Sequence, residues 1–388
     1  MNFLYLTKDR QKSVKLITVL FLIAGLILSF RLWAGERLFP LVPFVDGLER
    51  IPYQFNYVPL LFLIFLLLYE LYKPNKWSLA LALIALFFLI LQDQNRLQPW
   101  VYIYILILLP FCFSYFFKTT EKDLTRPMRI IFIFMYFWSG VQKVNSNFIN
   151  EGFTRILAGL FKIQDPIIIR NLLPLGYIIP VIEIFVAICL LSKKFRHLGV
   201  SLAVFTHIFI LIYVSPIGIN YNYIVCPWNV AMIFLVIILF YKDDTDFIFW
   251  NAKPLKATFI NYFYILLLGL LPILNFWGQW DDNLSFSLYS EKRRIFYIAI
   301  SDKYMKQFDH KFDDYFLKLD DNVQGGKVID VNKWSMKELN VPICPEIRVF
   351  EKITKDFCRY GIPSTDIIFL MYEGTVVDEN LTKWTCEK

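Results

Sequence analysis

The sequence predicts a polytopic α-helical membrane protein of about eight or nine spans, with a small α+β domain at its C-terminal end. The chain of 388 residues is 57% hydrophobic and 18% aromatic, which is more apolar than a soluble protein of this length requires. Apolar runs of roughly 14 to 20 residues recur as far as residue 277 and then stop. We therefore assign residues 1–277 to a transmembrane domain and residues 278–388 to a second domain.

Nine apolar segments are candidate membrane spans. They are Leu16–Leu32, Val58–Leu71, Leu79–Leu91, Trp100–Phe117, Met128–Val144, Leu172–Leu191, Leu198–Val214, Tyr223–Tyr241 and Thr258–Trp277. Several are short for a full crossing, which leaves room for re-entrant or interfacial segments. After the fifth span, Phe153–Lys162 has the pattern of a short amphipathic helix that lies in the membrane interface.

The distribution of lysine and arginine predicts the orientation in the membrane. With the N-terminus in the cytoplasm, about sixteen of these residues fall in cytoplasmic segments and about seven in the loops on the other side. An odd number of spans then places residues 278–388 outside the cytoplasm. The basic cytoplasmic loops also explain the net charge of +7, and no basic stretch interleaved with aromatic residues argues for nucleic-acid binding.

The C-terminal residues 278–388 are numerous enough to bury a modest core. Apolar runs in this part predict two strands, and two further segments predict helices, one of which has a proline near its first turn. The strands are Arg294–Ile300 and Ile367–Tyr372, and the helices are Tyr304–Leu319 and Pro345–Tyr360. We expect this domain to dock a protein partner outside the cytoplasm.

Three of the six cysteines lie in the polar C-terminal part, namely Cys344, Cys358 and Cys386. In an extracytoplasmic compartment two of these three can form a disulfide, and the sequence does not say which two. None of the cysteines has the spacing of a zinc site or a thioredoxin-type motif, so we predict no metal.

One lysine stands out at the end of the fifth span. Lys143 follows an uncharged run from Ile130 to Gln142. An ammonium group in or beside hydrocarbon costs several kcal/mol, so such a residue is a candidate functional group. The alternative is that the side chain only extends to the interface and has no other role.

The predicted topology brings further polar residues to the same membrane depth. The turn Asp93–Trp100 joins the third and fourth spans, His207 lies in the outer half of the seventh, and the uncharged loop Ser215–Asn220 follows it. Lys143 and Asn145 end the fifth span on that side too. The turn contributes four candidate substrate-binding residues: Asp93, Arg96, Gln98 and Trp100. Outer loops are also simply polar, and a lone histidine on an apolar face is more often structural, so both interpretations stay open.

Glu183 is the other charge inside an apolar segment, near the middle of the sixth span, where burial favours the protonated carboxyl group. It can pair with Lys143 or with His207. It can also act as a hydrogen-bonded tether between helices, which is the interpretation we favour.

This set of residues suggests a specific chemistry. A lysine in a low-dielectric pocket can be a neutral amine and act as a general base, while a neighbouring histidine or asparagine stabilises an oxyanion. A site of this kind that opens to the bilayer suits a lipid-soluble small molecule such as a quinol. In this hypothesis Lys143 is the base, His207 and Asn145 polarise the substrate, and Trp138 and Trp100 form walls of the pocket.

The stretch Tyr136–Gly152 resembles the transmembrane domain of vitamin K-dependent γ-carboxylase and its bacterial relatives, the horizontally transferred transmembrane (HTTM) family. The resemblance is specific in this stretch and loose over the rest of residues 10–280, and DoxX-like membrane proteins share the general appearance. The residues that carry it are Tyr136, Phe137, Gly140, Lys143, Asn145, Phe148 and Gly152.

The resemblance implies that Lys143 deprotonates a reduced quinone of the vitamin K type, and that His207 lies in the same pocket. It also implies a multi-pass protein of the bacterial inner membrane with a periplasmic C-terminal domain. Gln142 stands where the carboxylase has the first lysine of a pair, and residues 278–388 are far shorter than its lumenal region. Glutamate carboxylation itself is therefore not carried over.

A second hypothesis explains the same residues without catalysis. In a membrane scaffold, or in a partner-docking subunit of an envelope complex, the buried polar groups only hold helices together and residues 278–388 bind the partner. A DoxX-like redox accessory protein is a third interpretation. A transporter is less favoured, because we find no paired inverted repeat with broken helices.

Overall fold

The structure is a computed structural model that describes residues 9–117, 119–243, 255–292, 294–304, 311–317, 326–374 and 379–386. The chain folds into two compact units. The helical unit comprises Met1–Leu28, Leu60–Leu86 and Gln98–Glu291. The mixed unit comprises Ser29–Pro59, Phe87–Leu97 and Lys292–Lys388. Besides most of the predicted C-terminal domain, the mixed unit thus takes in two segments that flank predicted spans.

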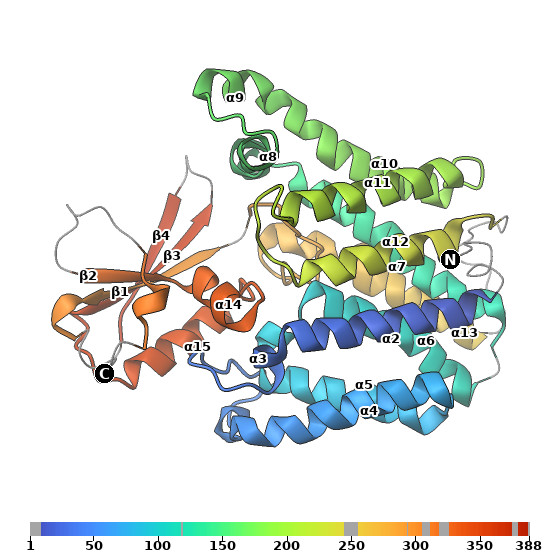
Figure 1. The fold of residues 1–388 in the computed structure, drawn as a ribbon, viewed down its shortest axis with the longest axis horizontal. Coiled ribbons are helices and arrows are strands. Elements are labelled where there is room, and N and C mark those ends of the chain that lie inside the picture. Colours follow the sequence, from blue (N-terminus) through green and yellow to red (C-terminus); the bar gives the residue numbers. More distant parts are fainter. Residues whose placement is uncertain are drawn as a thin grey trace. The chain divides into compact units, whose positions relative to one another are not determined.

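A helix forms at each of the nine predicted spans, and Figure 1 shows the long helices running side by side. The helices are α2 (Arg10–Leu28), α4 (Tyr57–Tyr72), α5 (Lys76–Gln92), α6 (Pro99–Phe116), α7 (Glu121–Lys143), α10 (Ile178–Leu191), α11 (Arg196–Val214), α12 (Val225–Phe240) and α13 (Leu255–Tyr264). Two of them are extended by further helical segments. The short α-helix α9 (Pro166–Leu172) and the 3-10 helix η5 (Leu173–Tyr177) precede α10, and the π-helix η6 (Ile265–Leu270) and the 3-10 helix η7 (Leu271–Trp277) follow α13.

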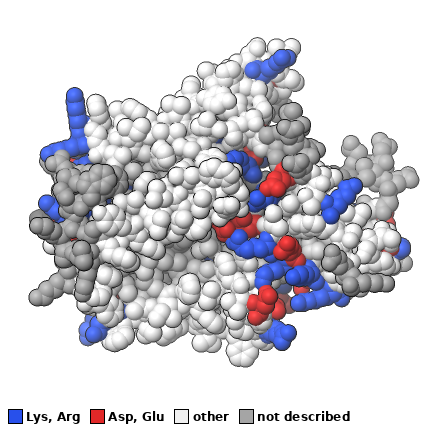
Figure 2. All heavy atoms as spheres, turned by 180° about the vertical axis from the view of Figure 1, so that it is seen from behind, with Lys and Arg blue, Asp and Glu red and all other residues white. Residues whose placement is uncertain are grey.

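These helices have the composition and surface of membrane spans. Among the described residues, six helical segments are long and apolar enough to cross a bilayer, and α5 and α12 are apolar but shorter. Large apolar side chains point outward from several of them, for example Leu61, Ile84 and Val181, which are all at least 60% exposed. Figure 2 shows wide areas of the surface without any charged side chain. The prediction of a polytopic helical membrane protein is therefore confirmed.

Helix α7 is the centre of the helical unit and packs against α10, α6, α12 and α13. It begins with a capping box, in which Thr120 and Asp123 each bond the other's backbone N–H. Its contact with α10 is close: a Cβ on Gly140 would lie 2.7 Å from Pro180 O and from Ile184 Cγ1. A small residue at this position lets the two backbones approach, as is common between membrane helices.

After α7 the chain turns through η4 (Phe148–Gly152) into α8 (Phe153–Leu160), so a helix does form where the amphipathic segment was predicted. Its apolar residues Phe153, Ile156 and Leu157 are buried against partly buried side chains that include Tyr213 of α11. That α8 lies in the membrane interface stays a prediction.

The sheet of the mixed unit is entirely antiparallel, with the strand order β2-β1-β3-β4. Its strands are β1 (Ile295–Ser301), β2 (Gly326–Asp330), β3 (Ile367–Gly374) and β4 (Glu379–Trp384). In the register, Ile298 of β1 lies opposite Ile329 of β2 and Phe369 of β3. Strands β1 and β3 were predicted. The two outer strands were not, because β2 has few apolar residues and β4 alternates charged and polar residues with only two apolar ones.

Two helices accompany the sheet, α14 (Val331–Leu339) and α15 (Ile347–Cys358). The prediction of α15 is confirmed, and its Phe350 stacks on Phe296 of β1 with ring centroids 4.7 Å apart. The helix predicted over Tyr304–Leu319 is wrong for residues 311–317. There the chain forms a short 3-10 turn, η9 (Asp313–Tyr315), and Phe316 bridges to Ile329 of β2. Residues 305–310 and 318–319 lie outside the described residues.

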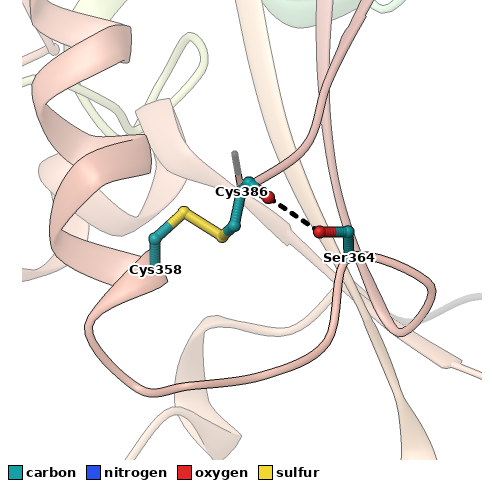
Figure 3. The surroundings of a disulfide bond; sticks show 3 residues. All are labelled: Cys358, Ser364 and Cys386. Atoms are coloured by element: carbon teal, nitrogen blue, oxygen red, sulfur yellow. Dashed lines mark hydrogen bonds between the residues drawn. A yellow bond between two sulfur atoms is a disulfide. The ribbon is translucent and has the colours of Figure 1, made fainter. Parts of the chain in front are cut away.

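Cys358 and Cys386 form the disulfide, which ties the end of α15 to the residues after β4 (Figure 3). The Ser364 hydroxyl donates to the carbonyl oxygen of Cys386 at 2.7 Å. The third candidate, Cys344, is buried and is not part of this disulfide.

The segments 29–59 and 87–97 belong to this unit through specific hydrogen bonds. They contain α3 (Phe30–Trp33), η1 (Leu48–Arg50), η2 (Tyr53–Asn56) and η3 (Gln94–Arg96). The N–H groups of Leu38 and Phe39 donate to the carboxylate of Glu338 in α14. The N–H of Cys344 donates to Asn95 Oδ1 at 2.9 Å.

Candidate functional site

Lys143, the last residue of α7, forms a buried ion pair with Glu183 of α10. Its Nζ lies 2.8 Å and 3.1 Å from the two carboxylate oxygens, and both side chains are 7% exposed. The same Nζ donates to Ser139 Oγ at 2.7 Å. An ammonium group has three protons, so these partners use its hydrogen-bonding capacity. The amine thus points into the helical unit. Of the two partners predicted for Glu183, Lys143 and His207, the structure pairs it with Lys143.

His207 of α11 is hydrogen-bonded at both ring nitrogens. Its Nε2 lies 2.7 Å from the Tyr136 hydroxyl and its Nδ1 lies 2.8 Å from Asn229 Oδ1. The Asn229 amide donates to Val225 O at 2.8 Å, which fixes its oxygen toward the ring. An amide oxygen only accepts, so Nδ1 is the donor, and in the neutral imidazole Nε2 accepts from the tyrosine. This chain of bonds joins α7, α11 and α12.

One cavity of about 110 Å³ is lined by both groups: Lys143 and Glu183, and Tyr136, His207 and Asn229. The rest of its lining is mostly apolar, with side chains that include Met135, Phe148, Ile156, Phe209, Val214 and Leu288. An engineered protein cavity of about 150 Å³ holds one benzene molecule. The cavity is thus somewhat smaller than one that holds a single aromatic ring.

Trp138 and Asn145 lie near Lys143 in sequence but are not among the residues that line the cavity. The Trp138 indole N–H donates to Gly269 O at 3.2 Å, and its ring lies against Phe276. Asn145 closes the end of α7, because its amide donates to Gln142 O at 2.7 Å and its oxygen accepts from the N–H of Phe148 at 2.9 Å.

Gln98 and Trp100 also lie away from the cavity lining, at the start of α6. Gln98 is the residue that precedes the helix and is 2% exposed. The Trp100 ring packs against α2 so closely that a Cβ on Gly25 would lie 2.5 Å from it. The position of Trp100 is explained by packing between α2 and α6.

Asp93 and Arg96 belong to the mixed unit. Asp93 caps η3 by accepting from the N–H of Asn95 at 3.0 Å, and it pairs with Arg37. The Arg96 guanidinium is 1% exposed. It donates to Leu32 O, Trp33 O, Leu89 O and Gln92 Oε1 at 2.7 to 2.9 Å. The two residues therefore join segments 29–59 and 87–97 to each other.

Sequence reasoning missed the two hydrogen-bond partners of His207, which also line the cavity. Tyr136 was noted as part of a motif but was given no role, and Asn229 was not singled out. Asn229 stands alone as an amide in the apolar run of α12, and it is 2% exposed. A single polar residue in the interior of a membrane helix is a recognisable signal, because its unpaired burial is unfavourable. Within the described ranges no group of three or more His, Cys, Asp or Glu residues could hold a metal ion.

The central part of the chain matches a protein-family model. Residues 121–227 match the model of the methylamine utilisation protein MauE. This MauE-like segment begins with the first residue of α7, ends within the first turn of α12, and contains Lys143, Glu183 and His207. Neither the search of curated proteins nor the search of solved structures gives a match.

The predicted resemblance to the HTTM family and γ-carboxylase, and the more distant one to DoxX-like proteins, is therefore wrong, since the matching model is that of MauE. The structure gives a physical reason for the misleading motif. Gly140 allows α7 to approach α10, Lys143 pairs with Glu183, and Asn145 closes the helix end. A buried helix end of this kind needs these residue types for packing, whatever the family.

Proposed function

We propose that this multi-pass membrane protein is a non-enzymatic accessory protein, in which the helical unit is an anchor and the mixed unit binds a partner protein. The observation that carries the proposal is the closed pairing of the candidate catalytic groups. The Lys143 ammonium is bonded to Glu183 and Ser139, and both nitrogens of His207 have partners. A general base needs an accessible lone pair, whereas a tether between helices needs this pairing.

The geometry supports the tether in a second way. The ion pair links α7 to α10, and the His207 chain links α7 to α11 and α12. The ion pair and the Tyr136–His207 bond join α7 to helices later in the chain, and the His207–Asn229 bond joins two consecutive helices, all within a mostly apolar interior. Such contacts fix which helices are neighbours and in which register they pack. This is the role expected of polar residues in a scaffold.

The MauE-like segment suggests the cellular process in which the accessory protein takes part. The matching family is named for methylamine utilisation, and we extend that process to this chain. The partner would be a protein of the cell envelope that contacts residues 278–388. This extension includes a cytoplasmic N-terminus, a mixed unit on the periplasmic face of the inner membrane, and contact with membrane lipid around the helical unit.

Binding of a reduced quinone stays a prediction. The cavity contains Lys143 and His207 together, as that prediction requires, but its volume of about 110 Å³ gives the prediction no support. The two functions differ in one testable respect. An enzyme needs the amine of Lys143 and the imidazole of His207, while a scaffold needs only that the helices stay packed.

The test is complementation in the organism that carries the gene. Its deletion should impair growth on methylamine, and the wild-type gene should restore growth. The single variant Lys143→Met should restore it poorly and accumulate at a lower level in the membrane. The double variant Lys143→Met/Glu183→Met should restore both level and growth, because it removes the two charges together.

Two results would overturn the proposal in different ways. If the double variant reaches the wild-type level in the membrane but does not support growth, the charges themselves are required and the scaffold is rejected. If the deletion grows normally on methylamine, the process inferred from the family is rejected.

A further inference from the structure

The mixed unit contains a second hollow, of about 520 Å³, that is separate from the site described above. One wall is the segment from Arg31 to Asn56, and the other is α15. Unlike the cavity in the helical unit, it is lined largely by charged groups. The cationic side chains are Arg31, Arg37, Arg96, Arg348, Lys352, Lys355 and Arg359.

Helix α15 contributes four of these cations from one face. Arg348, Lys352, Lys355 and Arg359 follow one another at intervals of four, three and four residues, which places them on one side of a helix and its last turn. The opposite face carries Val349, Phe350, Ile353 and Phe357, all of them buried. A basic helical face is often only a solvated surface, but this one borders a concave space.

The hollow has more positive than negative charge. Its acidic lining residues are Asp46, Glu49, Glu351 and Asp356. Two carboxylates just outside the lining, Asp93 and Glu346, pair with Arg37 and Arg348, so the hollow keeps only a small excess of cations. Lys352 pairs with Asp46, and Arg359 lies 3.3 Å from Asp356. In the described part of the chain, Arg31 and Lys355 have no carboxylate within ion-pair distance. Like charges gathered in a concave surface repel one another, and a bound anion relieves this repulsion.

The wall of the hollow is close in sequence to two candidate membrane spans. Arg31 follows the end of α2 at Leu28 by three residues, and three extended residues reach about 10 Å. Tyr53 and Asn56, at the other end of the wall, lie within the candidate span Tyr53–Tyr72. The same wall segment also exposes large apolar side chains, with Val45 at 55% and Phe55 at 65%.

We propose that this basic hollow is a binding site for a phosphate-bearing anion. Guanidinium groups match the geometry of phosphate oxygens, and several of them here are held by the surrounding structure. A volume of about 520 Å³ exceeds what a bare phosphate needs and falls in the usual range for small-molecule sites. Two sources share this chemistry. One is the head group of an anionic phospholipid, whose acyl chains would remain in the bilayer, and the other is free phosphate from the water phase.

The test uses the full-length protein in nanodiscs and two probes. The first probe is phosphatidylglycerol at 20%, on the order of biological content, in phosphatidylcholine, with lipid retained on the protein counted by native mass spectrometry. The second is inorganic phosphate, titrated against the protein in pure phosphatidylcholine. The pocket variant is Arg31→Gln/Lys355→Gln, because neither residue leaves a carboxylate unpaired. The control variant is Lys327→Gln/Lys383→Gln, which removes the same charge from β2 and β4.

We expect the pocket variant to bind the recognised probe about ten- to thirty-fold more weakly, since each cation near an anionic lipid contributes about 1 kcal/mol. The control variant should bind as the wild type does. Loss of phosphatidylglycerol identifies the lipid source, and loss of inorganic phosphate alone identifies the free anion. If both variants bind both probes equally, the proposal is overturned. Should the double variant melt at a lower temperature than the wild type, Lys355→Gln alone provides the comparison, with a smaller expected loss of about five-fold.

Discussion

Replacing Lys143 with methionine should destabilise the helical unit strongly, and the size of the effect can be estimated from the structure. The ammonium and the Glu183 carboxylate are each 7% exposed and lie 2.8 Å apart. Removing one member of a buried pair leaves the other charge uncompensated, which costs about 3–5 kcal/mol. Methionine has a similar length, so the cavity that it leaves is small. In a unit of about 250 residues, such as the helical unit, the loss corresponds to a fall in melting temperature of roughly 6–20 °C.

The double variant Lys143→Met/Glu183→Met provides the decisive comparison. Exchange of a whole buried pair for apolar side chains is often neutral or stabilising. We therefore expect the second substitution to recover most of the stability lost with the first. A coupling of this kind, in which the two effects do not add, is the property that a double-mutant cycle measures.

The assay is thermal unfolding of the detergent-purified protein. The readout at each temperature is the fraction that remains monodisperse on size-exclusion chromatography. Lys194→Met is the matched control, because Lys194 is exposed and its removal should change stability by less than about 0.5 kcal/mol. The reasoning is refuted if Lys143→Met melts with the wild type. It is refuted equally if the double variant is as unstable as the two single losses added together.

Three further predictions concern packing and cross-links. In the mixed unit, Arg96→Leu should prevent stable folding, because it leaves several buried carbonyl groups without a donor at about 1–3 kcal/mol each. Arg96→Lys should restore little stability, because lysine lacks the planar guanidinium group. The measurement for both variants is the yield of monodisperse protein. Gly140→Leu should separate α7 from α10 and lower the melting temperature more than Gly47→Ala, whose Cβ would contact nothing within 4 Å, although its positive φ of 99° adds strain. Cys358→Ser/Cys386→Ser should lower the free energy of unfolding by about 3–4 kcal/mol, because the disulfide closes a loop with a sequence separation of 28. A reductant should lower the melting temperature of the wild type but not of this variant.

The sequence was sufficient for the membrane helices, and the reason is physical. A segment inside a bilayer must satisfy its own backbone hydrogen bonds, so apolar length alone predicts a helix. The sheet of the mixed unit is different. Strand β1 has an apolar run, but β4 reads Glu379–Trp384 with a charged residue near each end, and pairing with β3 is what makes it a strand. Sheet pairing depends on partners far along the chain, which periodicity does not contain.

The candidate site shows the same limit at the level of side chains. The sequence identified Lys143, Glu183 and His207 as unusual because a polar group in an apolar helix is costly wherever it points. It did not identify which of them face each other. Lys143 and Glu183 are forty residues apart in the sequence, and their pairing depends on how closely Gly140 lets α7 approach α10. The rotation of each helix is a property of packing and was not predictable from one sequence.

The treatment of charge distinguishes the two candidate sites. Lys143 and Glu183 cancel each other within the helical unit, where an uncompensated charge is expensive. The hollow of the mixed unit keeps an excess of cations, several of them partly exposed, such as Arg348 at 41% and Arg359 at 69% of the side chain. Such an excess persists at low cost only where water or a ligand can supply the opposite charge. A group that is already neutralised by its neighbour has little capacity left for a ligand. For this reason we assign the structural role to the buried pair and the binding role to the basic hollow.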